Sequence, residues 1–390
     1  IFLILSCASC KKSIENSGNS FYIESFRKPG MDDYETLMAA YDSVPDHSKL
    51  FFAPKTYTFG HTPIINKSLG FFGPATIKRE DQIVYTLKEP ANANSSVLVL
   101  NYTKGINASD RFFLTFGQSH EKNSLINTVI KVSGDTLFLN NPLDTTEEGI
   151  GTYDIGTKLF KSINFFFVLT TGSSYEEGCS FNDLLFDGNR DHNQGSYSWR
   201  LNSAILTETK TTTLYRHSKF INSPGETIVG HNADIRNCTF YNLNGSAFHT
   251  SADRLTSAES EIHSYLSDNL FENTNQVLNS VGGHSEGTIT HSNSGGYYTA
   301  TKNTFINVGE AVLGTLYPSV SIHDWGTSDI TFTGNTINGA GNIVQSVAVL
   351  PGTIHDVRIE KNSISNVVAP ASSYDLAFWP NVIVKTVSGQ

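Results

Sequence analysis

The segment Asn269-Leu-Phe271-Glu-Asn273 is one copy of a short phrase that recurs through the second half of the chain. The other copies are Cys179-Ser-Phe181-Asn182, Ser218-Lys-Phe220-Ile-Asn222, Cys238-Thr-Phe240-Tyr-Asn242, Asn303-Thr-Phe305-Ile-Asn307, Asn335-Thr-Ile337-Asn338 and Asn362-Ser-Ile364-Ser-Asn366. From Phe220 onward, successive anchors (the Phe or Ile of each phrase) are separated by 20, 31, 34, 32 and 27 residues. A strand-rich repeat of this length, with Asn at fixed offsets, predicts a parallel β-helix.

Two columns, meaning positions that recur on successive coils, support this prediction. Five residues before the anchor stand mostly bulky apolar side chains suited to an inward stack: Tyr215, Ile235, Leu266, Ala300, Phe332 and Ile359. Two residues before it stand small or amide side chains that can form an internal hydrogen-bonded ladder: Cys179, Ser218, Cys238, Asn269, Asn303, Asn335 and Asn362. Cys179 and Cys238 would share this column about two coils apart, beyond disulfide reach, so we expect both to be buried and unpaired.

Composition narrows the class of protein. The chain has 390 residues, enough to bury a large core. Because 38% of the residues are hydrophobic and only 16% are charged, a disordered chain is excluded. The formal net charge of −10 argues against general nucleic-acid binding, which needs a basic face. With 31 Gly and only 2 Met, the chain favours an all-β fold over a helical one.

Upstream of the repeat, residues 30–44 have helical periodicity, with Asp32 or Asp33 as the N-cap. Leu37, Met38 and Tyr41 would lie on one face of this helix, which we expect to cap the open end of the solenoid. Residues 95–160 interrupt the repeat with alternating strands and predict a small β insertion. The expected organisation is therefore a leader and tether over residues 1–20 and one β-helix body over residues 21–390.

The strand that follows the helix carries a more specific signal, Leu50-Phe-Phe-Ala-Pro54-Lys-Thr-Tyr57. An acidic capping helix followed by an "apolar-apolar-x-Pro-x-x-Tyr" strand resembles the N-terminal signature of the pectate-lyase-like superfamily. The phrase Leu185-Phe-Asp187-Gly188-Asn189-Arg190-Asp191 also resembles a turn common in that superfamily. The resemblance covers about residues 22–370. It implies a right-handed, single-stranded parallel β-helix that hosts uronate lyases, glycoside hydrolases or non-catalytic glycan-binding modules.

The first residues resemble the end of a signal peptide. Ile4-Leu5-Ser6-Cys7 is similar to a bacterial lipoprotein box, in which Cys7 would carry the lipid, and Cys10 is a second candidate. An ordinary signal peptide that happens to contain Cys is the alternative. We therefore expect an exported bacterial protein, anchored in the outer membrane through an N-terminal lipid or located in the periplasm or at the cell surface.

The preferred activity is a polysaccharide lyase that cleaves a uronate glycan by β-elimination. This reaction needs a base for the C5 proton, a group that neutralises the carboxylate, and an acid for the leaving oxygen. We expect His249 to be the base or proton shuttle, because imidazole titrates near neutral pH. Asn279, aligned beside His249 on the next coil, and Arg254 would neutralise the carboxylate, while His231 and His284 would assist.

Basic and aromatic residues suggest where an acidic polysaccharide would bind. Arg216 and Arg236 fall in one outward column and would repel each other unless an anion lies between or over them. Lys219 would point outward on the same coil. The alternative pairs the arginines with nearby acids such as Glu208. Trp199 and Trp325 are the loop aromatics best placed to stack on sugar rings.

Two other functions stay open. A glycoside hydrolase needs two carboxyl groups within ~10 Å, and Glu226 and Glu310, the acidic residues at the expected strand starts, lie about three coils apart. Loop carboxylates could supply the pair instead: Asp187, Asp253, Glu259, Glu261 and Asp324. A non-catalytic glycan-binding protein is the third reading. No zinc-type spacing of His and Cys occurs, no cofactor is assigned, and calcium, common in such lyases, stays open.

Overall fold

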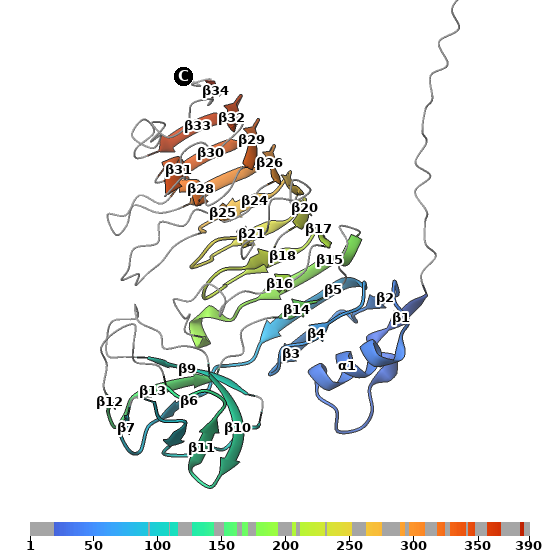
Figure 1. Ribbon diagram of the computed structural model, residues 1–390. Coiled ribbons are helices and arrows are strands. Elements are labelled where there is room, and N and C mark those ends of the chain that lie inside the picture. The colour runs from blue at the N-terminus through green and yellow to red at the C-terminus, as the bar shows by residue number, and fades with distance from the viewer. Residues whose placement is uncertain are drawn as a thin grey trace, which may run out of the picture.

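In the computed structural model the chain winds into stacked coils, seen as successive tiers of strands from β4 up to β34 in Figure 1. The residues that the structure describes are 19–92, 94–108, 110–115, 127–143, 152–161, 166–170, 177–193, 205–207, 211–230, 232–251, 263–274, 289–292, 296–308, 318–323, 328–340, 342–347, 357–367 and 383–385. Each complete coil contributes one strand to each of three parallel ladders. The predicted all-β parallel β-helix is confirmed.

The first ladder contains β1 (Ser20–Tyr22), β2 (Lys49–Phe51), the first halves of β5 (Gly70–Arg79) and β15 (Glu177–Asp187), then β17 (Thr212–Arg216), β20 (Asn232–Arg236), β23 (His263–Ser267), β26 (Gly296–Thr301), β29 (Ser328–Thr333), β32 (Val357–Glu360) and β34 (Ile383–Lys385). The second contains β3 (Thr56–Phe59), the second halves of β5 and β15, then β18 (Lys219–Ile221), β21 (Thr239–Tyr241), β24 (Leu270–Glu272), β27 (Thr304–Val308), β30 (Thr336–Ala340) and β33 (Ser363–Val367). The third contains β4 (Ile64–Ile65), β14 (Phe167–Leu169), β16 (Ile205–Thr207), β19 (Ile228–Gly230), β22 (Phe248–Ser251), β25 (Ile289–Ser292), β28 (Pro318–His323) and β31 (Asn342–Val347).

The anchor side chains form a stack inside the helix. The rings of Phe186, Phe220, Phe240, Phe271 and Phe305 follow one another at centroid distances of 4.8 to 5.0 Å, with planes 7° to 16° apart. All five are at most 1% exposed. The ring spacing matches the distance between neighbouring strands, so each coil adds one ring to the stack.

The sequence analysis misplaced the first copy of the repeat. Phe186, and not Phe181, pairs with Phe220, while Phe181 pairs with Tyr215 in the first ladder. Cys179 therefore does not share the column of Cys238. The error arose because β15 runs through two ladders and carries a similar phrase in its first half. Both cysteines are buried and free, as expected.

A ladder of buried Asn side chains connects the later coils. Asn303 donates from Nδ2 to the carbonyl oxygen of Leu266 at 3.1 Å and to Asn335 Oδ1 at 3.1 Å. Its Oδ1 accepts from the backbone N–H and the Nδ2 of Asn269, both at 3.0 Å. Asn335 and Asn362 continue the same pattern. The predicted internal ladder is confirmed, and it replaces backbone hydrogen bonds at a corner where the strands cannot supply them.

In five of the phrases an Asn two residues after the anchor makes the next corner. Asn222, Asn242, Asn273, Asn307 and Asn366 all have a positive φ, between 49° and 59°. Asn is among the few residues that adopt this left-handed conformation readily, because its short amide can bond locally. The fixed offset of Asn in the sequence therefore reflects the backbone conformation of a repeated turn.

A helix covers the N-terminal end of the coils, as predicted. α1 (Asp33–Ser43) follows the 3-10 turn η1 (Ile23–Phe26), and Asp32 forms a capping box with Glu35. Leu37 and Tyr41 are buried against the first coils. Figure 1 places α1 beside β1 and β3, at the end of the stack. Among the described residues, no helix is long and apolar enough to cross a membrane.

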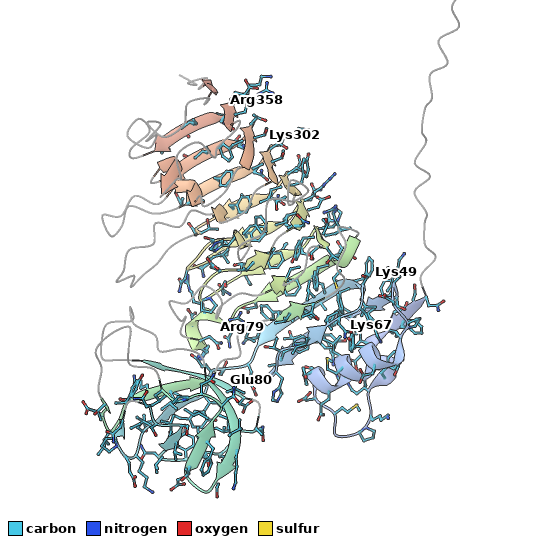
Figure 2. The ribbon with its side chains drawn as sticks, in the orientation of Figure 1. Lys49, Lys67, Arg79, Glu80, Lys302 and Arg358 are labelled. Atoms are coloured by element: carbon cyan, nitrogen blue, oxygen red, sulfur yellow. The ribbon has the colours of Figure 1, made fainter. Side chains whose placement is uncertain are left out.

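An antiparallel unit interrupts the coils between β5 and β14. Its sheet runs in the order β6 (Val84–Thr86), β13 (Lys158–Lys161), β9 (Arg111–Thr115), β10 (Asn127–Ser133), β11 (Thr136–Leu139) and β8 (Val97–Val99), with β7 (Ala91–Asn92) and β12 (Thr152–Tyr153) as a separate pair. It has its own buried cluster, which includes Tyr85, Leu137 and Leu159. Its strands begin at Val84, earlier than the expected residue 95. Figure 2 shows Arg79 and Glu80 where the chain leaves the coils for this unit.

We predict that Asn303→Ala lowers the free energy of unfolding by about 2 to 5 kcal/mol, because it leaves the buried ladder partners on both neighbouring coils unpaired. Urea denaturation followed by circular dichroism measures this. Thr304→Ala, next to it on the half-exposed outer side, is the matched control and should cost far less. Equal losses in the two variants would contradict a structural role for the ladder.

We predict an acid-sensitive N-terminal cap. The hydrogen-bonded Arg27 guanidinium lowers the pKa of Glu24 to about 2. The folded pKa lies below the unfolded value of ~4.3, so this stabilisation is complete above pH ~4.3 and is lost as the pH falls toward ~2. Across that window the thermal midpoint of the wild type should fall more steeply than that of Glu24→Gln. Glu89→Gln, an exposed site in the insertion, should keep the wild-type slope, and a wild-type slope in Glu24→Gln would refute the assignment.

Candidate functional site

The outer face of the third ladder carries His249. Parallel pairing of β19, β22 and β25 places Val229, His249 and Thr290 side by side on successive coils. Ile228 and Phe248 belong to the interior cluster, and side chains alternate along a strand. His249 therefore projects outward. It is nevertheless only 5% exposed, so this part of the outer face is covered.

The neighbour expected for His249 was wrong. Equal spacing from the anchor placed Asn279 beside it, but the register places Thr290 there. The chain between β24 and β25 spans residues 273–288, whereas the connection between β21 and β22 spans only residues 242–247. Because of this extra length the position beside His249 falls on Thr290, and Asn279 lies outside the described residues.

Glu226 is the partner of His249. Glu226 lies in the turn before β19, is 3% exposed, and contacts His249 Nδ1 through Oε1. An ionised carboxylate can only accept hydrogen bonds, so with Glu226 ionised the shared proton belongs to Nδ1. In the neutral ring this leaves the lone pair on Nε2. A carboxylate that orients an imidazole in this way produces a general base with a defined tautomer.

The sequence analysis had assigned Glu226 to a different role. It was considered only with Glu310 as one of two hydrolytic carboxyl groups, and Glu310 lies outside the described residues. The backbone N–H of Thr227 donates to the carbonyl oxygen of Ser246 at 2.9 Å, so the turns before β19 and β22 stack directly. In this register Glu226 aligns with Ser246 on the next coil, which lies three residues before His249. A search for acids offset in this way could have found the pair.

The turn that carries Glu226 has little freedom to move. Ser223 Oγ donates to the carbonyl oxygen of Glu226 at 3.3 Å. A Cβ at Gly245 would lie 2.8 Å from the backbone nitrogen of Glu226, closer than real contacts allow. Glycine at this position therefore permits the two turns to pack against each other.

The two arginines expected to share a column do so, but an acid neutralises part of their charge. Arg216 and Arg236 pair in register on β17 and β20. Asp234 Oδ2 lies 2.8 Å from Arg216 Nη2, and Asp234 Oδ1 lies 2.7 Å from Arg236 Nε. The bond to Asp234 raises the pKa of Arg236. Asp234 is thus the acid that pairs with both arginines, the role for which Glu208 was considered. Arg216, Asp234 and Arg236 together keep one net positive charge.

Arg236 also stacks on an aromatic ring. Its guanidinium carbon lies 4.6 Å from the centroid of Tyr265 on the next strand. The Arg236 side chain is 45% exposed and that of Arg216 is 24% exposed. Lys219, at the start of β18 in the second ladder, is exposed. These cations lie on different ladders from His249, so they do not form one compact site with it.

Several expected site residues lie outside the described part of the chain: His231, Arg254, Asn279, His284, Trp199, Trp325 and Cys7. Of the predicted residues, the structure brings Arg216 together with Arg236 on the first ladder, and it pairs His249 with Glu226, which had not been expected as its partner. Among the described residues, no group of three or more His, Cys, Asp or Glu side chains could hold a metal ion.

Comparisons with known proteins complete this description. No family model matches the chain. No curated protein matches it. Ten chains of solved structures match it.

Three of these structures are phage tailspikes. Gp54 of Acinetobacter baumannii bacteriophage AP22, in complex with A. baumannii capsular saccharide, is 11% identical, with a TM-score of 0.24 and coverage of 89% of this chain and 72% of that one. Gp61 of Pseudomonas phage phi297 is 10% identical, with a TM-score of 0.20 and coverage of 85% and 68%. Gp49 of Pseudomonas phage LKA1 is 12% identical, with a TM-score of 0.19 and coverage of 86% and 74%. Scores this low carry no argument about function.

We predict that Asp234→Asn destabilises the protein by about 1 to 3 kcal/mol at low salt, because two stacked guanidinium groups lose their shared anion. Thermal unfolding at 0.01 M and 1 M salt measures the effect, which salt should reduce by screening the repulsion. Asp183→Asn is the control, since Asp183 is exposed and lies near a histidine rather than two arginines. An equal and salt-independent loss in both variants would contradict the shared-anion role.

Proposed function

We propose that the protein is a polysaccharide lyase that cleaves a uronate-containing glycan by β-elimination, with His249 as the base. The observation that supports this most directly is the buried contact between Glu226 and His249 Nδ1. A carboxylate-oriented imidazole on the outer face of a β-helix strand is suited to proton abstraction from a bound chain. The sequence resemblance to the pectate-lyase-like superfamily supports the same proposal.

β-Elimination at the uronate breaks one C–H bond and one C–O bond and forms one C–C double bond. His249 Nε2 takes the C5 proton of the uronate, and the C–H electron pair becomes the C4–C5 double bond. The C4–O bond breaks with its electron pair on the departing oxygen, which takes a proton from solvent water to become a hydroxyl group. The His249 imidazolium then gives its proton to the hydroxide left behind. Glu226 stabilises the imidazolium that forms and keeps the ring in place. Arg254 remains the proposed partner of the uronate carboxylate, with His231 and His284 assisting.

The contact between Glu226 and His249 bears on the choice between elimination and hydrolysis. Hydrolysis needs two carboxyl groups at the bond to be cleaved, whereas Glu226 is already engaged by His249, which favours elimination. His249 is 5% exposed, so a glycan reaches it only if the site opens on binding. Export with a lipid on Cys7 is part of the same proposal and is supported by the sequence of residues 4–7.

A non-catalytic glycan-binding protein is the second candidate. The Arg216–Asp234–Arg236 trio supports it, because it presents a net positive charge on a ladder away from His249. Guanidinium groups bind carboxylates and sulfates through directed hydrogen bonds. An acidic glycan could therefore bind along the first ladder without being cleaved.

The test is ultraviolet absorbance during incubation with pectin, alginate, chondroitin, hyaluronan and heparin-type glycans. Elimination creates an unsaturated uronate that absorbs, so we expect absorbance to rise on at least one glycan. His249→Gln should reduce the rate by about 10² to 10⁴. His217→Asn is the matched control, because His217 is exposed and its left-handed φ suits Asn. It should keep the wild-type rate.

Other results would overturn the proposal. New reducing ends without absorbance would indicate a hydrolase. No product on any glycan, with salt-sensitive binding that is lost in Arg236→Gln, would indicate the binding protein. Circular dichroism of each variant separates a loss of activity from a loss of fold.

A further inference from the structure

The turn after β15 fastens the insertion to the coils. Asn189 is 7% exposed and has a φ of 52°. Its Nδ2 donates to the carbonyl oxygen of Arg79 at 3.1 Å and to Asp81 Oδ1 at 2.7 Å. The 3-10 turn η2 (Arg190–His192) follows it directly. These hydrogen bonds attach the turn to the segment through which the chain enters the insertion, at Arg79 and Glu80 in Figure 2.

From this anchored turn, Arg190 reaches two coils further along the helix. Its backbone N–H donates to the carbonyl oxygen of Asn222 on the next coil at 3.0 Å. Its Nη1 then donates to Asn244 Oδ1 at 3.1 Å and to the carbonyl oxygen of Asn242 at 3.4 Å. Arg190 and Asn244 are 54 residues apart in sequence. One side chain thus spans the corner that precedes the third ladder.

Asn244 is hydrogen-bonded in its turn to the segment that carries Glu226. Asn244 Nδ2 donates to the carbonyl oxygen of Pro224 at 3.3 Å. Its backbone N–H donates to the carbonyl oxygen of Ser223 at 3.0 Å. Ser223 and Pro224 are the first half of the turn that ends at Glu226. Gly245, the next residue on the same coil, donates from its backbone N–H to the carbonyl oxygen of Gly225 at 3.3 Å. Asn244 and Gly245 therefore hold this turn together, and Arg190 holds Asn244.

We infer that Arg190 is a positioning residue for Glu226, and through it for the imidazole of His249. The path runs from Arg190 to Asn244, then to the Ser223–Pro224 turn and Glu226. This path gives a role to the phrase Asp187-Gly188-Asn189-Arg190. Its last residue, Arg190, bonds residues two coils away. The effect on turnover depends on the proposed function, but the effect on the geometry of His249 does not.

The test reads the His249 ring directly. Protein labelled with ¹⁵N only at histidine gives the two ring nitrogen shifts of each His, and His249→Gln assigns its signals by their loss. In the wild type we expect His249 to be held as the Nδ1–H form. Glu226→Gln should remove this preference. Arg190→Met, which keeps length but removes the donors, should move the Nδ1 shift at least halfway toward the Glu226→Gln value.

Rescue and control variants separate positioning from simple stability. Arg190→Lys keeps a donor for Asn244 Oδ1 and should restore the wild-type shifts at least in part. Arg358→Met, an exposed arginine on β32, should leave His249 unchanged. In every variant the exposed His217 ring serves as an internal reference. If Arg190→Met does not fold, Asn244→Leu removes the next link in the path and should produce the same shift.

Turnover gives the second readout. On a glycan that the wild type cleaves, Arg190→Met should lower kcat by about tenfold or more with little change in KM, because a small displacement of a base is costly. Wild-type His249 shifts in both Arg190→Met and Asn244→Leu would overturn the inference, even if the thermal midpoint falls. Altered shifts in a protein that cleaves no glycan would uphold the positioning role and reject the proposed lyase activity.

Discussion

Most other features of the molecule depend on the register in which the coils stack, and buried amide hydrogen bonds maintain that register in the later coils, from β20 to β33. Each Asn of the ladder donates to a carbonyl oxygen of one coil and bonds the Asn of the next. These amides are at most 5% exposed, and an unpaired buried amide is costly, so a coil that slips by one residue would lose stability with the bonds. The stacked phenylalanine rings add apolar burial along the same axis.

This register brings distant residues together on the outer faces. On the third ladder it aligns the turn of Glu226 with the turn before His249. On the first ladder it aligns Arg216 with Arg236, which then share Asp234. Neither arrangement needs residues close in sequence, because neighbours in space are one coil apart. Functional side chains thus form columns along the faces of the solenoid. A neighbouring side chain, such as Asp234 beside Arg216 and Arg236, decides how much of a column's charge is neutralised.

Much of the fold could be predicted from the sequence because repetition reveals it. The Phe anchors, the Asn ladder and the capping helix each have a periodic or local signal, such as Asp32 with Glu35 in the capping box. The pairing of Phe186 with Phe220 was missed because β15 contains a false copy of the phrase at Phe181. The site was harder, because it depends on loop lengths that vary from coil to coil. That variation is why Thr290, and not the residue at equal spacing from the anchor, pairs with His249.

The account rests on His249 acting at the outer face of the third ladder. A crystal structure of the His249→Gln variant with an acidic oligosaccharide tests this most directly. The account predicts a uronate ring over β22, with its C5 atom within about 3.5 Å of the substituted side chain. An oligosaccharide bound only along β17 and β20, with the outer face at β22 still covered, would contradict it.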